Sequence, residues 1–280
     1  MIKLLVDSAA DIAQEEADKL GITLLPIEVR FGEKEYLDGV DLLPAQFYEM
    51  LKDCKELPKT SQINPFRFEE YFEEATKDGD EVICIVISSG LSGTYLSACQ
   101  GAEKFEGKVH VIDSLNACIG QRMLCFYALE LIKQGLSAKQ IADILNEDKL
   151  KLKVMATIDT LKYLKMGGRI SALTAFAGEA LGIKPIIAVV DGKIKMLDKA
   201  RGFRKGCMTL MNMAQNMDID FTKPLAYIWS GTDDSVVKQF KIDSAHLFAE
   251  KPGEKEHYVI GSTVGAHIGA GAVGFAFFVK

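Results

Sequence analysis

The segment from residue 82 to residue 98, VICIVISSGLSGTYLSA, constrains the fold of this chain more than any other. Its first six residues are apolar and mostly β-branched, and such a run is typical of a strand buried on both faces of a parallel sheet. The next seven residues hold four hydroxyl groups and two glycines, and a helix is expected to begin after them. A strand, a glycine-rich loop and a helix in this order are the building unit of a doubly wound α/β sheet.

The loop at residues 88–94 has the composition of a binding site for a small anion. Glycines let the backbone approach a ligand closely, and hydroxyl groups supply donors without net charge. The first N–H groups of the following helix add further donors. The loop lacks the lysine of a P-loop, and no serine in it has the G-x-S-x-G spacing of a nucleophile elbow. A plain turn in which the hydroxyl groups cap the helix is the structural alternative.

Length and charge limit the classes of protein to consider. A chain of 280 residues is long for one domain, so two domains are expected. Hydrophobic residues make up 48% and charged residues 26%, which is ordinary for a soluble globular protein. The net charge of -6, without a run of Lys or Arg, argues against nucleic acid or an anionic membrane surface as the main partner.

Neither a targeting segment nor a metal site is expected. The apolar run at the N-terminus ends at Asp7, and the run at residues 264–279 is broken by His267 and four glycines, so no stable membrane insertion is predicted. The six cysteines are scattered without a C-x-x-C pair, which predicts reduced thiols in a cytoplasmic protein. The four histidines are far apart in the sequence, so no metal and no other cofactor is predicted.

Strand and helix patterns alternate through the first half of the chain. Strands are predicted at residues 3–6, 22–29, 82–87 and 109–112, with a small hairpin around Gly32. Helices are predicted at residues 11–20, 44–54, 65–77, 119–133 and 138–147, with caps at Asn64 and Ser137. This alternation predicts a Rossmann-like α/β domain over residues 1–152, with a doubly wound, mostly parallel sheet.

The second half has a different pattern. Strands are predicted at residues 154–158, 185–190, 193–197, 225–229, 258–262 and 273–279, and Asp191-Gly192 is a strong hairpin signal. Helices are predicted at residues 160–166, 172–181, 204–216 and 235–250. Residues 153–280 are therefore expected to form an α+β domain with an antiparallel sheet. Because no linker separates the halves, the two domains should pack on each other.

Several polar segments are expected at one edge of the first sheet, where doubly wound sheets bind their ligands. Asp7-Ser8, the loop at residues 88–94 and Asp113-Ser114 each follow a predicted strand, and Thr60-Ser61-Gln62 precedes a capped helix. Any one of these segments is more often a cap or a turn than a site. Together they predict a polar binding cleft.

Two motifs of the second half are further candidates. Gly167-Gly168-Arg169-Ile170-Ser171 places one cation at a glycine break, for which a helix end with a solvated arginine is the alternative. His267 is expected in a loop of small residues between apolar strands, where its ring has little to pack against. That setting favours a hydrogen bond from the imidazole to an anion. Arg201, just before a long helix, is a weaker candidate.

Seven motifs, in order along the chain, resemble those of the DegV family. They are DSAAD from Asp7, TSQINP from Thr60, SSGLSGT from Ser88, VIDS from Val111, GGRIS from Gly167, IKPI from Ile183 and HIGAGAVG from His267. Each motif is short, but their order over the whole chain makes the resemblance specific. Two motifs depart from the family pattern: Ala9 and Ala10 replace hydroxyl residues, and Ala270 replaces a proline.

The resemblance implies a non-catalytic, fatty-acid-binding subunit of a bacterial fatty acid kinase. Such proteins hold one long-chain fatty acid with its tail buried and its carboxylate at the domain junction. They present it to a separate ATP-dependent kinase, which forms an acyl phosphate. Carried over by motif, the residues that contact the carboxylate are Thr60, Ser61, Ser92 and His267. Arg169 and Arg201 match positions implicated in kinase docking or phosphoryl transfer.

A lipid anion agrees with the residue types. Neutral hydroxyl groups and one histidine suit a monoanionic carboxylate or a protonated acid, whereas a phosphate calls for several Lys or Arg side chains. Burying an acyl tail gains roughly 0.8 kcal/mol per methylene, so the head-group site needs mainly to orient the ligand. The tail is expected among apolar side chains that include Ile and Phe residues of the second domain.

Two other functions stay open on the sequence. An acyl hydrolase would need Ser92 or a neighbouring hydroxyl within hydrogen-bond reach of His267, with a carboxylate behind the imidazole. A sugar-phosphate or nucleotide-phosphate binder would use the loop at residues 88–94 together with Arg169.

Overall fold

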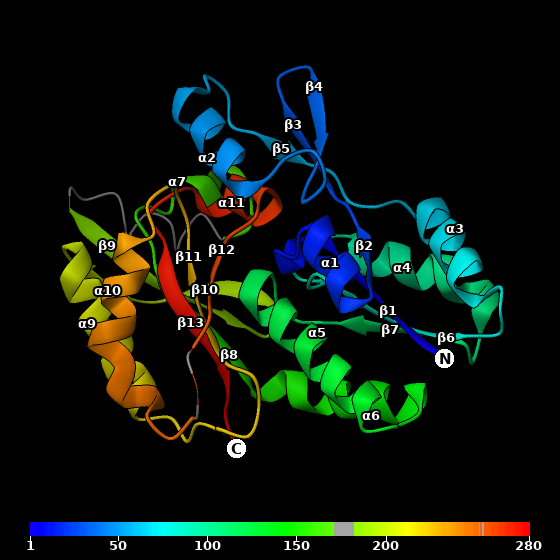
Figure 1. Ribbon diagram of the computed structural model, residues 1–280. Coiled ribbons are helices and arrows are strands. Elements are labelled where there is room, and N and C mark those ends of the chain that lie inside the picture. The colour runs from blue at the N-terminus through cyan, green and yellow to red at the C-terminus, as the bar shows by residue number, and fades with distance from the viewer. Residues whose placement is uncertain (171–181, 252, 254) are drawn as a thin grey trace.

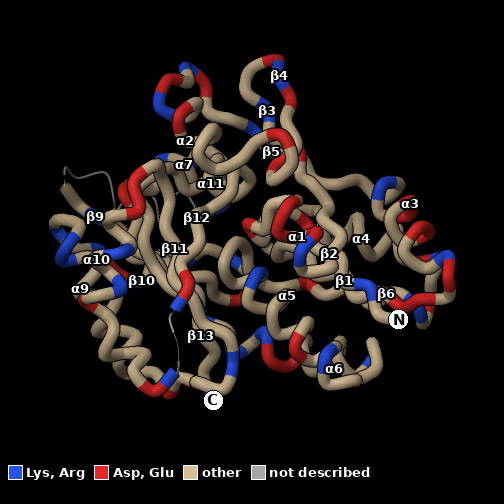
Figure 2. The backbone as a smooth tube through the Cα atoms, viewed as in Figure 1, with Lys and Arg blue, Asp and Glu red and all other residues tan. Residues whose placement is uncertain are grey.

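The computed structural model describes residues 1–170, 182–251, 253 and 255–280. Figure 1 shows two main sheets side by side, with helix α5 (Cys118–Lys133) between them and a third, smaller sheet above. The predicted combination of a parallel sheet with a largely antiparallel one is confirmed. Figure 2 shows that basic and acidic residues are interspersed on the outer helices and turns.

The helices of the first half begin where the sequence signals place them, with one exception. They are α1 (Gln14–Leu20), α2 (Pro44–Asp53), α3 (Pro65–Thr76), α4 (Thr94–Ala102), α5 and α6 (Ala138–Asp148). The Asn64 side chain accepts from the Arg67 N–H at 3.0 Å, and Ser137 forms a capping box with Gln140. The exception is the helix predicted from residue 11, which begins at Gln14 because residues 8–10 form a 3₁₀ turn.

The first sheet has four parallel strands in the order β2-β1-β6-β7. They are β1 (Ile2–Asp7), β2 (Ile22–Leu25), β6 (Glu81–Val86) and β7 (Val109–Asp113). Val82, Cys84 and Val86 pack in the apolar cluster of α3 and α4. Ile83 and Ile85 pack on the opposite face, in the cluster that contains α5. Both faces of β6 are therefore buried, which is why its apolar run is unbroken.

The second sheet has six strands in the order β10-β9-β8-β13-β11-β12, antiparallel except between β11 and β12. Its strands are β8 (Leu152–Thr157), β9 (Ile183–Val190), β10 (Lys193–Arg201), β11 (Ala226–Trp229), β12 (His257–Val259) and β13 (Val273–Phe278). The predicted hairpin is confirmed, and its turn residues Asp191 and Gly192 have φ values of 52° and 73°, as a two-residue hairpin turn requires.

Helices of the second half cover one face of this sheet and its upper edge (Figure 1). They are α7 (Lys162–Met166), α9 (Phe203–Gln215), α10 (Ser235–Ser244) and α11 (Ser262–Ile268). The helix predicted to reach residue 250 ends earlier, and a 3₁₀ turn at Ala245–Phe248 follows it. The helix predicted at residues 172–181 lies outside the described residues.

The third sheet was predicted only as a hairpin. It has three antiparallel strands in the order β4-β3-β5, which are β3 (Glu28–Phe31), β4 (Lys34–Leu37) and β5 (Lys59–Thr60). The single strand predicted at residues 22–29 is wrong. The chain leaves the first sheet before Pro26, which has no N–H for a strand ladder, and enters the small sheet at Glu28.

A division of the chain near residue 152 separates the strands of one half from those of the other, but some helices pack across it. All strands before Ser114 belong to the first and third sheets, and those of the second begin at Leu152 or later. Helix α5 packs on both main sheets, and α11 packs on α2 of the first half. We therefore propose residues 1–152 and 153–280 as two closely joined units. None of the described helices is long and apolar enough to cross a lipid bilayer.

A buried arginine joins these units. Arg122 of α5 is 1% exposed, and its Nη1 donates to the Asp11 carbonyl at 2.6 Å. Its Nη2 pairs with Glu16 of α1, and the guanidinium carbon lies 3.6 Å from the ring centroid of Tyr258 in β12. A cation taken out of water in this way is stable only while its partners stay in place.

We expect Arg122→Met to lower the free energy of unfolding by about 3 kcal/mol, because it leaves the partners of a buried cation unpaired. Arg67→Met is the matched control. Its pair with Glu70 is on the surface, with the two side chains 55% and 44% exposed, so its loss should stay within about 1 kcal/mol. Denaturant titration of both variants measures the difference, and equal losses would contradict the structural role of Arg122.

Candidate functional site

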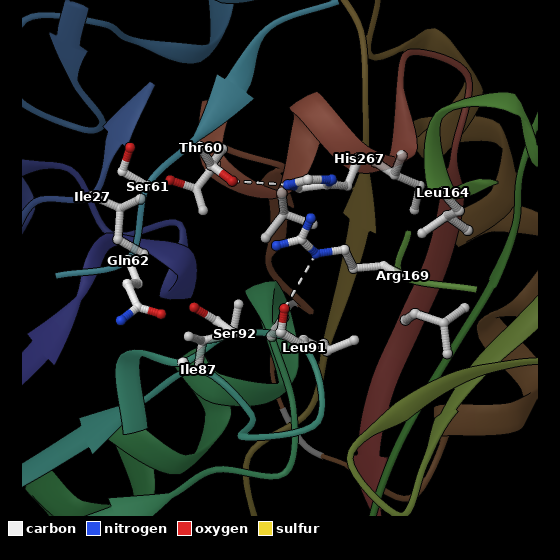
Figure 3. A pocket seen from close by; sticks show the side chains of 16 residues that line it. Ile27, Thr60, Ser61, Gln62, Ile87, Leu91, Ser92, Leu164, Arg169 and His267 are labelled. Atoms are coloured by element: carbon white, nitrogen blue, oxygen red, sulfur yellow. Dashed lines mark hydrogen bonds between the residues drawn. The ribbon is translucent and has the colours of Figure 1, made fainter. Parts of the chain in front are cut away.

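A cavity of about 230 Å³ opens beyond the carboxyl ends of β2 and β6, between the first sheet, the small sheet and α11. Figure 3 shows its lining. The lining residues are Ile27, Thr60, Ser61, Gln62, Ile87, Leu91, Ser92, Gly93, Ala117, Leu164, Arg169, Ile194, Thr263, Val264, His267 and Ile268. Five of the six predicted site residues, all except Arg201, are thus brought together.

One polar wall of the cavity is the end of β5. Thr60 pairs with Val29 of β3, and the Ser61 N–H donates to the Glu28 carbonyl at 3.1 Å. These backbone bonds fix the direction of both hydroxyl side chains. Gln62 follows, and its Nε2 donates to the Ser97 hydroxyl of α4 at 3.3 Å. The three residues TSQ therefore link the small sheet to the first turns of α4.

The loop at residues 88–93 forms the facing wall. The Leu91 and Ser92 N–H groups both donate to the Ser88 carbonyl at 3.0 Å, so the loop is a compact turn. The Ser92 hydroxyl is 2.9 Å from that of Thr94 at the start of α4. The Ser88 hydroxyl donates to the Gly192 carbonyl at 2.7 Å, so the tip of the β9–β10 hairpin rests on this loop. That contact brings Ile194 of β10 to the cavity.

His267 lies in the last turn of α11, so the prediction of a loop is wrong. The small residues around it serve helix packing. A Cβ on Gly265 would lie 2.6 Å from the Phe47 ring, and therefore only glycine lets α11 approach α2 so closely. The helix ends at Ile268, and the N–H of the following Gly269 donates to the Gly265 carbonyl at 2.8 Å.

His267 and Thr60 form the central polar pair of the site. His267 Nε2 lies 2.9 Å from Thr60 Oγ1, across 207 positions of sequence (Figure 3). Its Nδ1 is buried and has no hydrogen-bond partner among the described residues. Burial, and to a smaller extent the positive charge of Arg169, lowers the pKa of His267 to about 4. The imidazole is therefore neutral at pH 7.

Arg169 reaches across the cavity between the two polar walls. Its Nε donates to the Leu91 carbonyl at 3.2 Å, and its Nη1 donates to the Gly167 carbonyl. In the view of Figure 3 its guanidinium lies between the Thr60–His267 pair and Ser92. Arg169 is the one permanently charged side chain among the described lining residues. Arg201 is exposed at the end of β10 and lies outside this lining.

The rest of the lining is apolar and comes from both halves of the chain. Ile27 and Ile87 belong to the first half, and Leu164, Ile194 and Ile268 to the second. The described lining contains isoleucines but no phenylalanine, and which residues contact an acyl tail stays a prediction. Most described phenylalanines of the second half belong instead to the apolar cluster of Phe240, Phe248 and Phe275, whereas Phe278 packs in the cluster that contains α5.

Two of the predicted polar segments take no part in the cavity. Asp7 is fully buried, and its carboxylate accepts from the Ile87 N–H at 2.7 Å and the Gln121 amide at 3.0 Å. The Ser8 hydroxyl accepts from the Ile27 N–H at 3.0 Å. Asp113 accepts from two N–H groups of neighbouring loops, and Ser114 from one. These side chains hold the loops that line the cavity, so the prediction that they form the cleft itself is wrong.

Thr263 and Val264 were not identified from the sequence, although both line the cavity. The signal was available as a spacing: Thr263 and His267 are four residues apart and therefore share one face of a helix. The prediction of a loop at His267 concealed it. Among the described residues, no group of three or more His, Cys, Asp or Glu side chains is placed to hold a metal ion.

Among the residues that the structure describes, the arrangement required of a serine hydrolase is not present. A serine hydrolase needs its base bonded to the nucleophile and a carboxylate behind the base. Here Thr60 occupies Nε2 of His267, and no described carboxylate bonds to Nδ1. Ser92 is bonded to Thr94 on the facing wall.

We expect His267→Gln to weaken the pH dependence of folding stability. Because the pKa of His267 is about 4 in the folded chain and ordinarily 6.5, the unfolded chain binds the extra proton between these values. The contribution of His267 to the free energy of unfolding is therefore fully present above pH 6.5. It falls by about 3 kcal/mol as the pH falls to about 4. Denaturant titrations at pH 7 and pH 4 measure how much the free energy of unfolding falls between these pH values. We expect the fall to be smaller in the variant by about 3 kcal/mol. His246→Gln, at an exposed position, is the control.

Comparisons with known proteins agree with the fold. Residues 1–280 match the family model described as "Uncharacterised protein, DegV family". A DegV domain-containing protein of Clostridium perfringens is 33% identical over 284 residues, which cover 98% of this chain and 96% of that relative.

Two solved structures share the whole fold. A DegV family protein from Thermus thermophilus, described for its fatty acid binding, is 28% identical with a TM-score of 0.88, covering 100% of this chain and 99% of that chain. A stearic acid-binding protein from Eubacterium ventriosum is 27% identical with a TM-score of 0.87, at the same coverage. Since the family model spans the whole chain and the relative aligns over nearly its full length, this protein belongs to the DegV family.

Proposed function

We propose that this protein binds one long-chain fatty acid in the cavity and presents it to a separate ATP-dependent kinase for acyl-phosphate formation. The observation that carries the proposal is a cavity with neutral hydroxyl donors, a neutral histidine and one arginine on its polar walls, and isoleucine, leucine and valine elsewhere. The solved structures of relatives named for fatty acid binding support the ligand class. A cytoplasmic location is supported by six cysteines that are all free.

The head group fits the polar end of the cavity. A carboxylate between the two walls would accept hydrogen bonds from Thr60, Ser61 and Ser92, and from Nε2 of His267 in the tautomer that carries its proton there. Arg169 donates to the Leu91 and Gly167 carbonyl groups, so we assign the carboxylate contacts to the hydroxyl groups and His267.

The tail would lie along the isoleucine, leucine and valine side chains of the lining. Ten buried methylenes supply about 8 kcal/mol before the cost of association.

We propose that the separate kinase, and not this chain, carries out acyl-phosphate formation. The hydroxyl bonded to His267 is that of Thr60, and no described carboxylate bonds to the other imidazole nitrogen, so the described residues form no hydroxyl–histidine–carboxylate triad there. Arg169 lies at the head group, where a transferred phosphoryl group would arrive, and Arg201 is exposed to a docking protein. We therefore assign Arg169 to phosphoryl transfer and Arg201 to docking.

We expect protein purified from a bacterial host to carry one long-chain fatty acid, detected by mass spectrometry of the denatured sample.

Ser92→Ala and His267→Ala should each weaken acid binding about tenfold, because each removes a hydrogen bond to a charged group, worth about 1.5 kcal/mol or more. Isothermal titration with delipidated protein measures the affinity.

Ser89→Ala is the matched control for Ser92→Ala, because Ser89 is an exposed serine of the same loop, outside the cavity lining. Protein without lipid that takes up no added acid would contradict the proposed function. Turnover of a generic ester that Ser92→Ala abolishes would favour the hydrolase instead.

We expect Arg169→Ala to reduce kinase-dependent acyl-phosphate formation about tenfold or more while lipid content falls less than threefold. The physical reason is that the tail supplies most of the binding energy, whereas the transferred phosphoryl group adds negative charge beside Arg169. Arg201→Ala should lower formation without any change in lipid content. Arg67→Ala, at an exposed position on α3, is the control. The assignment of Arg169 to phosphoryl transfer would be contradicted if Arg169→Ala bound less lipid but formed the same amount of acyl phosphate per bound lipid.

A further inference from the structure

Helix α11 is held at both of its ends by the small sheet. At its last turn, His267 bonds to Thr60 of β5. At its first turn, Ser262 and Thr263 bond to Asp38, the residue that directly follows β4. Strands β4 and β5 flank β3 in one sheet, so the two contacts are parts of one rigid frame. Figure 1 shows α11 directly below this sheet.

Asp38 makes an unusually complete cap. The side chain is 2% exposed, and its Oδ1 accepts from the Ser262 N–H at 3.0 Å and from the Ser262 hydroxyl. Its Oδ2 accepts from the Thr263 N–H at 3.2 Å. Both carboxylate oxygens are therefore used, and together they satisfy N–H groups that have no partner inside the helix. Asp38 is itself fixed, because its own N–H donates to the Ile27 carbonyl at 3.0 Å.

Two more side chains of the first half hold the segment that enters α11. Asp11 Oδ1 accepts from the Gly261 N–H at 2.8 Å, and the Tyr48 hydroxyl donates to the Ile260 carbonyl at 3.0 Å. The helix has only seven residues, and a helix of this length is not stable on its own. Its position is therefore set by these contacts rather than by its own backbone.

A carboxylate is an expensive cap at this position. Burial raises the pKa of Asp38 and that of Asp11, which means that burying their charges opposes folding. A neutral Ser or Asn cap would satisfy one N–H group without that penalty. What the carboxylate adds is two oxygens in one plane, which fix the rotation of the helix as well as its end.

We propose that Asp38 is the positioning residue of the head-group site, because it fixes the rotation of α11 and thereby the distance between His267 and Thr60. Thr263 and His267 share one helix face, about 6 Å apart along the axis. A small rotation at Thr263 moves the imidazole by a comparable amount. The bond from His267 to Thr60 is 2.9 Å long and is lost when it lengthens beyond about 3.5 Å.

The test uses Asp38→Asn in the full chain and rests on the proposed function for its ligand. Asparagine has the same shape but offers one acceptor where Asp38 offers two. We expect the preference for palmitic acid over its primary alcohol to fall about tenfold, because the alcohol uses the tail but not the head-group contacts. Titrations of delipidated protein with both lipids measure the preference, and NMR follows the titration of the His267 imidazole, whose midpoint should rise from about 4.

Asp148→Asn is the matched control. Asp148 is also a buried carboxylate, 7% exposed, and it pairs with Lys151 and Lys223 away from the cavity. It should lower stability but leave the preference and the His267 midpoint unchanged. Ser262→Ala removes one of the bonds to Asp38 and should give a smaller change in the same direction, which keeps the proposal testable if Asp38→Asn fails to fold.

The outcomes separate the two proposals. Wild-type protein that binds neither lipid would contradict the proposed function, while the His267 midpoint in the variants would still decide the role of Asp38. Asp38→Asn or Ser262→Ala with lower stability but an unchanged preference and midpoint would reduce Asp38 to a structural cap and overturn the positioning role.

Discussion

The burial of α5 between two sheets is the constraint on which the rest of the structure depends. Ten residues of this helix are buried, and it packs on the parallel sheet on one side and on the six-stranded sheet on the other. Helix α6 also packs on β6 and β7, and α5 connects this layer to the six-stranded sheet, so the two halves bury much of their cores together. Arg122 adds a polar tie at the same place, since its cation bonds to the first half and stacks on Tyr258 of the second.

The cavity is a consequence of this arrangement. Once α5 sets the two sheets side by side, the loop after β6 meets the tip of the β9–β10 hairpin, through the Ser88 bond to Gly192. The small sheet and α11 cover the remaining side, and their polar groups face one another as Thr60 and His267. Low dielectric surroundings strengthen these hydrogen bonds and keep His267 neutral, which suits recognition of a single carboxylate better than that of a multiply charged phosphate.

Much of the fold was predictable because its signals are local. The run before Ser88 indicated a doubly buried strand, Asn64 and Ser137 marked helix starts, and Asp191-Gly192 marked a hairpin, and all are observed. The errors occur where a local signal has two readings. The apolar run through Pro26 looked like one strand but serves two sheets, and the small residues around His267 looked like a loop but permit close helix packing.

By itself, the sequence determined the elements, the alternation that produces a parallel sheet, and the residue types available for an anion, because propensity, caps and turn chemistry act over a few positions. Only the tertiary structure decided which polar residues face the cavity. Asp7, Ser114 and Ser92 are all polar residues at or after the end of a strand. Asp7 and Ser114 nevertheless form hydrogen bonds within loops, and only Ser92 lines the cavity. Pairing across 207 positions depends on how the sheets and α11 pack, and no local pattern encodes that distance.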